Sequence, residues 1–148
     1  MDPICEHHLP SLTEEQTKAL IEASVKASKR AYCIYSKFPV GASLLMDNGE
    51  IVLGCNVENL AFPSTICAEA NAVTTAVASS DKLRKINSIC VWIDREEHAT
   101  PCGNCRQVLS EFIHCGHVPV LLLNNKLQAK KEIFSDLLPS IFRSKLGV

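Results

Sequence analysis

The sequence predicts an α/β domain in which helices pack over a mixed β-sheet. Two observations carry this prediction. Apolar runs typical of strands alternate with runs of helical periodicity, and no linker, repeat or low-complexity segment interrupts the 148 residues. The composition, 47% hydrophobic and 21% charged, is typical of a soluble globular protein and excludes a disordered chain. We therefore expect residues 1–148 to form a single domain with its own core.

The first predicted helix follows a polar opening segment, residues 1–11, which we expect to be a mobile tail. Thr13 and Gln16 have the spacing of a capping box, and small or apolar residues then recur at helical spacing as far as Ala31. The opening segment lacks the features of a secretion signal, and no apolar run is long enough to span a membrane. These features favour a cytoplasmic protein without a membrane partner. The net charge of −1 gives no support to nucleic-acid binding.

A β-hairpin is predicted next. Two apolar runs, Val40–Met46 and Ile51–Val57, flank the dipeptide Asn48-Gly49. Asn-Gly between two such runs is typical of a type I′ turn, which needs two residues that tolerate positive φ.

The middle of the chain then alternates helix and strand. An alanine-rich stretch from Cys67 to about Ser79 predicts a buried helix, and the β-branched run Ile86–Ile93 predicts a strand. The following helix should begin near Thr100, which can cap it, with Pro101 in the first helical position.

The end of the chain predicts one more strand and one more helix. The continuous apolar run Val118–Leu123 is typical of a buried strand, and a helix is expected over Ser135–Phe142. A hairpin followed by helix, strand, helix, strand and helix implies a mixed sheet covered by helices.

Eight cysteines are many for a reducing compartment, where metal binding or catalysis explains them better than disulfides. Cys102 and Cys105 form a C-x-x-C pair at a predicted helix start, and Cys67 lies at the start of the preceding helix. Three cysteine ligands would leave tetrahedral zinc one open position, the arrangement of a catalytic site. The pair alone is equally compatible with a thiol redox site. We expect packing or surface roles for the other five cysteines, Cys5, Cys33, Cys55, Cys90 and Cys115.

Glu69 is the only charged residue in the predicted helix that begins at Cys67. By itself it could be a surface carboxylate stabilised by the helix dipole. Beside a three-cysteine zinc site, a carboxylate that is not a ligand is the general acid and base that metal-assisted hydrolysis needs.

The motif "CAEA" followed by "PCGNCRQ" resembles the zinc-dependent cytidine deaminase pattern, [H/C]-x-E and then P-C-x-x-C. The stretches "AYCIYSKFPVGASLL", "GCNVENLAFPSTICAEA" and "DLLPSIF" are similar to the small, three-cysteine cytidine deaminases of pyrimidine salvage. The resemblance covers residues 31–142. It implies a three-layer α/β/α sandwich around a mixed five-stranded sheet, a homotetramer, and one Zn²⁺ per subunit.

The resemblance also implies an activity and its central residues. The expected reaction is hydrolysis of cytidine and 2′-deoxycytidine to the corresponding uridine nucleosides and ammonia. Cys67, Cys102 and Cys105 would bind zinc, and Glu69 would carry protons between water and the base.

Four further residues match positions that contact the nucleoside in this family. Asn56 and Glu58 would hold the ribose hydroxyls, Phe38 would pack against the pyrimidine, and the backbone of Ala68 would contact the base. Without the resemblance, Phe38 would be interpreted as a core aromatic residue, and Asn56 and Glu58 as polar residues at a strand end.

Phe62 and Phe142 match positions that complete the site of a neighbouring subunit. Many family members have tyrosine at the position of Phe62 and arginine at the position of Ala70. Three thiolates give a zinc site a formal charge of −1, and an arginine can offset this charge by hydrogen bonding. The sequence keeps only Arg106 for this thiolate neutralisation.

Two alternatives to cytidine deamination remain open besides the redox pair. One is a deaminase of another aminopyrimidine nucleoside such as blasticidin S, which the departures at Phe62 and Ala70 favour. The other is a non-catalytic, zinc-stabilised binding module, which would need a fourth protein ligand and an aromatic-lined basic groove.

Overall fold

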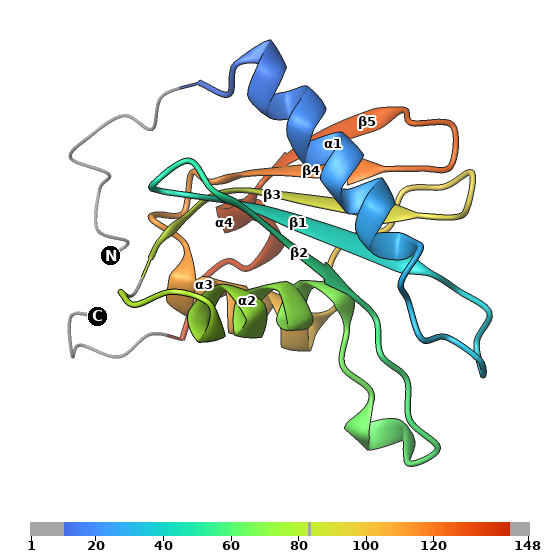
Figure 1. The fold of residues 1–148 in the computed structure, drawn as a ribbon. Helices are drawn as coiled ribbons and strands as arrows, with labels where there is room; N and C mark the ends of the chain where they lie inside the picture. The colour runs from blue at the N-terminus through green and yellow to red at the C-terminus, as the bar shows by residue number, and fades with distance from the viewer. Residues whose placement is uncertain (1–10, 83, 143–148) are drawn as a thin grey trace.

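A computed structural model describes residues 11–82 and 84–142 of the chain, so most of the expected tail, residues 1–11, lies outside the described residues. The described part contains one five-stranded sheet, one short 3-10 helix and several α-helices (Figure 1). In chain order the elements are α1 (Glu14–Ser28), β1 (Val40–Met46), β2 (Ile51–Cys55), η1 (Phe62–Ser64), α2 (Ala68–Ala78), β3 (Ile86–Ile93), α3 (Gly103–Phe112), β4 (Pro119–Leu123), β5 (Ala129–Ile133) and α4 (Phe134–Leu137). None of the helices in residues 11–82 and 84–142 is long and apolar enough to cross a membrane.

The sheet is mixed, as predicted, with strand order β2-β1-β3-β4-β5. β1 pairs antiparallel with both β2 and β3, β3 pairs parallel with β4, and β4 pairs antiparallel with β5. The crossover between the two parallel strands contains α3, which parallel neighbours require. This topology brings the beginning of α3 next to the beginning of α2.

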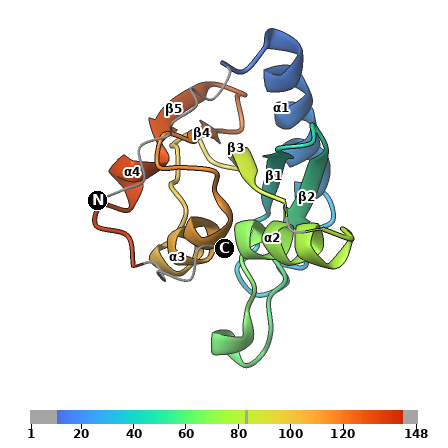
Figure 2. The same cartoon turned by 90° about the vertical axis from the view of Figure 1, so that its left-hand side faces the viewer.

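The helices cover both faces of the sheet, so the molecule has three layers (Figure 2). α1 covers one face and packs Leu20 against Leu45 and Leu121. α2 and α3 cover the other face, where the larger core also includes Phe134 of α4. The three-layer α/β/α sandwich with a mixed five-stranded sheet is therefore confirmed.

The predictions for the first elements are confirmed with two corrections. Thr13 and Gln16 form the complete capping box, although α1 ends at Ser28 rather than Ala31. The hairpin β1–β2 is present, but the prediction of a type I′ turn was wrong. Of the turn residues, only Gly49 has a positive φ, 86°. The turn is stabilised by hydrogen bonds from Gly49 N to Met46 O and from Glu50 N to Asn48 Oδ1.

Three later predictions also need correction. Thr100 does not cap α3 and Pro101 is not its first residue, because Cys102 occupies the N-cap and the helix begins at Gly103. The C-terminal helix is a single turn, Phe134–Leu137, and does not extend to Phe142. The prediction from residue patterns also missed β5, because this edge strand has the polar sequence AKKEI with an outer face exposed to solvent.

Gly54 allows α2 to lie directly on β2. A Cβ atom at this position would lie 2.3 Å from both Ala68 O and Ala72 N, which are backbone atoms that cannot move aside. In addition, Asn71 Nδ2 donates a 2.9 Å hydrogen bond to Cys55 O. These contacts fix the first turn of α2, and with it the residues that precede the helix, against the end of the hairpin.

Candidate functional site

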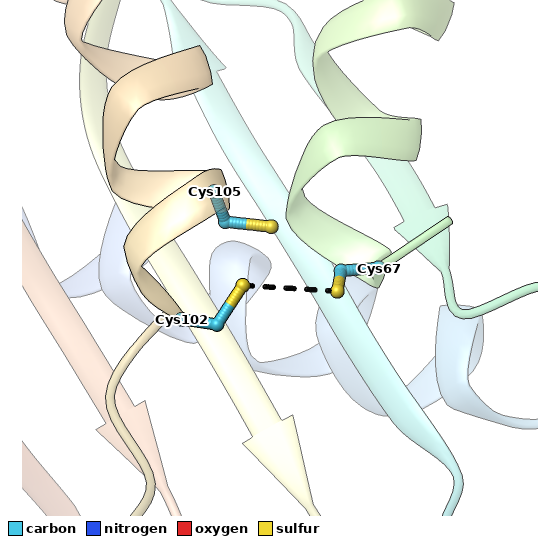
Figure 3. Close-up of side chains that lie close together, drawn as sticks. All are labelled: Cys67, Cys102 and Cys105. Atoms are coloured by element: carbon cyan, nitrogen blue, oxygen red, sulfur yellow. Dashed lines mark hydrogen bonds between the residues drawn. The ribbon is translucent and has the colours of Figure 1, made fainter. Parts of the chain in front are cut away.

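Two helix N-termini converge on the same point and each provides a cysteine at its N-cap. Cys67 is the N-cap of α2 and Cys102 is the N-cap of α3, and neither side chain caps its own helix by a hydrogen bond. Cys105, one turn into α3, points toward the same point (Figure 3). The unpaired N–H groups and the dipole at both helix ends favour negative charge here, and thus thiolates over thiols.

The spacing of the three sulfur atoms fits a tetrahedral metal ion. All three lie within 4.8 Å of one another, and the Sγ atoms of Cys67 and Cys102 are 3.9 Å apart (Figure 3). Tetrahedral zinc with bonds of about 2.3 Å to sulfur requires a separation of about 3.8 Å. Within residues 11–82 and 84–142 the group contains only these three ligands, which leaves the fourth position of tetrahedral zinc open.

The thiols interact strongly with one another. The interaction with the Cys105 side chain lowers the pKa of Cys67 to about 6, which makes Cys67 the thiolate of the pair. The same interaction raises the pKa of Cys105, and burial raises it further. The cluster thus already holds a thiolate at neutral pH, the form that binds metal.

Glu69 lies in the first turn of α2 with only 5% of its surface exposed. Burial, with a smaller contribution from the Cys67 charge, raises the pKa of its carboxyl group to about 7. Its Oε2 atom accepts a 3.8 Å hydrogen bond from Cys105 Sγ. A carboxyl group whose pKa is close to 7 can both accept and return a proton at neutral pH, as general acid–base chemistry requires.

A pocket of about 300 Å³ opens beside the cysteines. It collects most of the predicted site residues, although they come from segments that are far apart in the sequence. These are Phe38, Asn56, Glu58, Cys67, Ala68, Glu69 and Cys102, together with Ser36, Val40, Thr65, Val91, Ile93, Ala99 and Thr100.

Asn56 fixes the backbone around Phe38. Its Oδ1 atom accepts a hydrogen bond from Val40 N, and its Nδ2 atom donates one to Phe38 O, both at 2.9 Å. Asn56 is 7% exposed, so most of its side chain is buried in the protein. One Nδ2 hydrogen and one Oδ1 lone pair are not used by these two bonds.

Glu58 is held in place by a turn that sequence reasoning did not assign to the site. The backbone N–H groups of Tyr35 and Ser36 donate to Glu58 Oε2 at 3.0 and 3.1 Å, and the Ser36 hydroxyl donates to Oε1. The hydrogen bonds from Ser36 and Tyr35 lower the pKa of Glu58, so it stays ionised. Ser36 was missed because it is 22 residues from Glu58 in sequence, and no spacing rule connects them.

Two of the predicted substrate-binding residues lie outside this pocket. Phe62 is 71% exposed on η1 and Phe142 is 84% exposed near the end of the described chain. Tyr35 contacts Phe62 edge-on, with ring centroids 6.2 Å apart.

Arg106 does not hydrogen-bond to a thiolate, contrary to prediction. Its guanidinium donates instead to three oxygen atoms, namely Pro101 O at 2.7 Å, Leu137 O at 2.6 Å and Thr100 Oγ1 at 2.7 Å. Arg106 therefore ties the segment that leads into Cys102 to the C-terminal helix α4.

The remaining cysteines of the described residues are not part of the cluster. Cys33, Cys55 and Cys90 are free thiols, and burial raises the pKa of Cys90 to about 11. Cys115 is disulfide-bonded, a role that the expectation of packing or surface positions for the other five cysteines did not include.

The chain is similar to known deaminases in sequence and structure. Residues 14–121 match the family model described as the cytidine and deoxycytidylate deaminase zinc-binding region. A cytidine deaminase of Sporosarcina psychrophila is 46% identical over 123 residues, which cover 83% of this chain and 88% of that protein. A cytidine deaminase of Mycobacterium tuberculosis is 40% identical over 122 residues, which cover 80% and 84% of the two chains.

Solved structures agree with this assignment. The crystal structure of cytidine deaminase from Burkholderia pseudomallei has a TM-score of 0.79 at 36% identity and covers 88% of this chain and 100% of that chain. The Mycobacterium tuberculosis enzyme has a TM-score of 0.72 at 32% identity and covers 86% and 98% of the two chains. This chain, with its three-cysteine cluster at two helix N-termini and a buried glutamate beside it, therefore belongs to the cytidine and deoxycytidylate deaminase family.

Proposed function

We propose that this protein catalyses the hydrolytic deamination of cytidine and 2′-deoxycytidine. Water adds at C4 of the pyrimidine and ammonia leaves, so the products are uridine or 2′-deoxyuridine. The observation that carries the proposal is the position of buried Glu69 between the three-cysteine cluster and a pocket of about 300 Å³. A metal site without such a carboxylate and pocket would serve structure rather than catalysis.

Each protein group has a distinct task in this reaction. Cys67, Cys102 and Cys105 hold zinc, which supplies a Lewis acid that makes water more acidic when bound. Glu69 accepts a proton from the attacking water at Oε2 and delivers protons to N3 of the base and to the departing amine. Burial favours this role, because it brings the pKa of Glu69 close to neutral.

The nucleoside is oriented by the residues at the other end of the pocket. Glu58 accepts hydrogen bonds from ribose hydroxyls and Asn56 uses its remaining donor and acceptor for the sugar. Phe38 packs against the pyrimidine ring, and the backbone of Ala68 contacts the base. The pocket location of all four residues supports these roles.

A substrate panel on zinc-loaded and metal-stripped protein tests the function. We expect the loaded enzyme to convert cytidine and 2′-deoxycytidine, measured by absorbance loss and ammonia release, and the stripped enzyme to recover activity when zinc is returned. Faster conversion of blasticidin S than of either nucleoside would replace the proposed substrate. Bound zinc without turnover of any of the three would point to a binding module.

We also propose that the chain is a homotetramer whose sites are completed by neighbouring subunits through Phe62 and Phe142. In both ribbon views the segment that carries η1 projects away from the sheet (Figures 1 and 2). It exposes Leu60 (78%) and Phe62 (71%), and Ile66 at its end is also exposed. Clustered exposed apolar side chains of this size are typical of protein interfaces. Sedimentation equilibrium of the wild type and of Phe62→Ser would test this proposal. A monomeric wild type would contradict the assembly, and a tetrameric Phe62→Ser variant with unchanged activity would contradict the role of Phe62.

The cellular setting follows from the same chemistry. We infer a single-domain cytoplasmic enzyme without a nucleic-acid or membrane partner. Six cysteines of the described residues are free thiols, a state that a reducing compartment maintains, and the disulfide at Cys115 is the exception among them. Fractionation of source cells with an antibody against the chain would test the location.

A further inference from the structure

Arg95 places its guanidinium over the ring of Phe38, a contact that the proposed reaction does not use. The Cζ atom of Arg95 lies 4.9 Å from the ring centroid, within the range of a cation–π interaction. Phe38 lines the pocket, whereas Arg95 is exposed and lies outside the pocket lining. Phe38 therefore both lines the pocket and contacts Arg95 through its ring.

The backbone of Phe38 is fixed on both sides by side chains of the site. Asn56 binds Phe38 O and Val40 N at 2.9 Å, and the Ser36 hydroxyl accepts a 3.0 Å hydrogen bond from Phe38 N. These bonds leave the ring itself free to change its side-chain torsions. A contact with the ring is therefore the remaining way to set its orientation.

The segment that carries Arg95 is anchored independently of Phe38. Asn125 N donates a 2.9 Å hydrogen bond to Arg95 O, and Asn124 Nδ2 donates a 2.9 Å bond to Glu96 O. Arg95 Nη1 also bonds the carbonyl of Asp94 at 2.8 Å, which directs the guanidinium. The loop between β4 and β5 thus holds the cation in place over the ring.

We propose that Arg95 is a positioning residue that sets the orientation of Phe38 for packing against the substrate base. The inference rests on the proposed function for the identity of that base. The cation attracts one face of the ring, and this attraction reduces the torsional freedom that Phe38 would otherwise lose on binding substrate. The effect is on substrate binding, because neither residue contacts the cysteine cluster or Glu69 by a hydrogen bond.

A double-mutant cycle on the zinc-loaded enzyme tests this inference. Arg95→Ala should raise KM for cytidine about two- to fivefold with kcat within about twofold, the range that corresponds to an exposed cation–π contact. In a Phe38→Leu background the same change should leave KM unaltered, because Arg95 acts through the ring. Arg95→Lys keeps a cation and should restore part of the loss. Lys126→Ala is the matched control, since it removes a nearby cation paired with Glu96 at 3.0 Å and leaves Arg95 in place.

A second readout is independent of activity. The side-chain protons of Arg95 should show an upfield ring-current shift in the ¹H NMR spectrum, and Phe38→Leu should abolish it. Absence of that shift would overturn the inference whatever the enzyme does. An equal rise in KM for Arg95→Ala with and without Phe38, or a KM unchanged in an active enzyme, would also overturn it. A wild type that shows the shift but no cytidine turnover would overturn the proposed function, and with it the role of the contact in binding that base.

Discussion

Cys105 and Glu69 belong to different helices, yet Cys105 Sγ donates a 3.8 Å hydrogen bond to Glu69 Oε2. The bond joins the buried Cys105 of the metal cluster to the buried carboxylate at the meeting point of α2 and α3. A single packing arrangement of two helix starts therefore fixes both the metal ligands and the proton carrier. This arrangement has a cost in free energy, because it removes a carboxyl group from water.

This cost predicts how the stability of zinc-free protein depends on pH. The pKa of Glu69 is raised to about 7 from 4.5, so the folded state binds an extra proton between these values. The contribution of Glu69 to stability should therefore fall as the pH rises through this window, by a total of about 3 kcal/mol for a shift of this size. Glu69→Gln should remove that fall and make the metal-stripped protein more stable at pH 8, measured by urea unfolding.

The matched control for this experiment is Glu58→Gln. Hydrogen bonds from Ser36 lower the pKa of Glu58, so its contribution to stability is present at neutral pH and is lost as the pH falls through its folded pKa. The two variants should thus shift the pH profile in opposite directions. If stability depends on pH in the same way in Glu69→Gln and in the wild type, the raised pKa of the buried Glu69 carboxyl group would be contradicted.

Removing one cysteine of the cluster should abolish zinc binding. Cys102→Ser leaves two sulfur ligands and a hard hydroxyl that zinc does not favour, so the purified variant should contain less than about a tenth of the wild-type zinc. Cys55→Ser is the control, because this free cysteine lies outside the three-cysteine group. Full zinc content in Cys102→Ser, measured by atomic absorption, would remove Cys102 from the ligand set.

Gly54 should tolerate no side chain. Gly54→Ala places a Cβ 2.3 Å from Ala68 O and must push α2 away from β2, which should cost about 3 kcal/mol or more of stability, as severe core overpacking does. Gly103→Ala meets no atom within 4 Å and should be neutral within about 0.5 kcal/mol. Thermal unfolding of the two variants distinguishes them, and equal melting temperatures would mean that α2 does not pack as described.

Arg106 should stabilise the site rather than tune its charge. Arg106→Lys retains the positive charge but cannot reach Pro101 O, Leu137 O and Thr100 Oγ1 together, so it should lose about 2 kcal/mol of stability. If the lysine variant keeps the melting temperature of the wild type while Arg106→Gln loses zinc, the charge and not the hydrogen bonds would be what matters.

The Cys102–Cys105 pair could be predicted because its geometry is local, whereas Cys67 lies 35 residues from Cys102 and was added because it precedes another predicted helix. Cys67 and Cys102 each precede a helix, and the spacing of Cys102 and Cys105 lies within one helical turn. Hydrophobic patterning likewise predicted β1 and β3 residue for residue, because both strands are largely buried. Such features follow from periodicities that short windows of sequence contain.

Features that depend on distant contacts could not be predicted in this way. Ser36 reaches Glu58 across 22 residues, and Arg106 reaches Leu137 across 31. The cap of α3 was misplaced because Thr100 has the better capping side chain, whereas the cluster of sulfur atoms requires Cys102 at that position. In each case tertiary packing decides the role of a side chain whose local sequence permits several.

The most direct test of the account is the Glu69→Gln enzyme, assayed for bound zinc and for cytidine turnover in the same preparation. Loss of a general acid and base should lower kcat by about a hundredfold or more, with the zinc content of the wild type retained. The account predicts one zinc per chain and almost no uridine. Wild-type turnover by this zinc-loaded variant would contradict the central claim that Glu69 carries the proton.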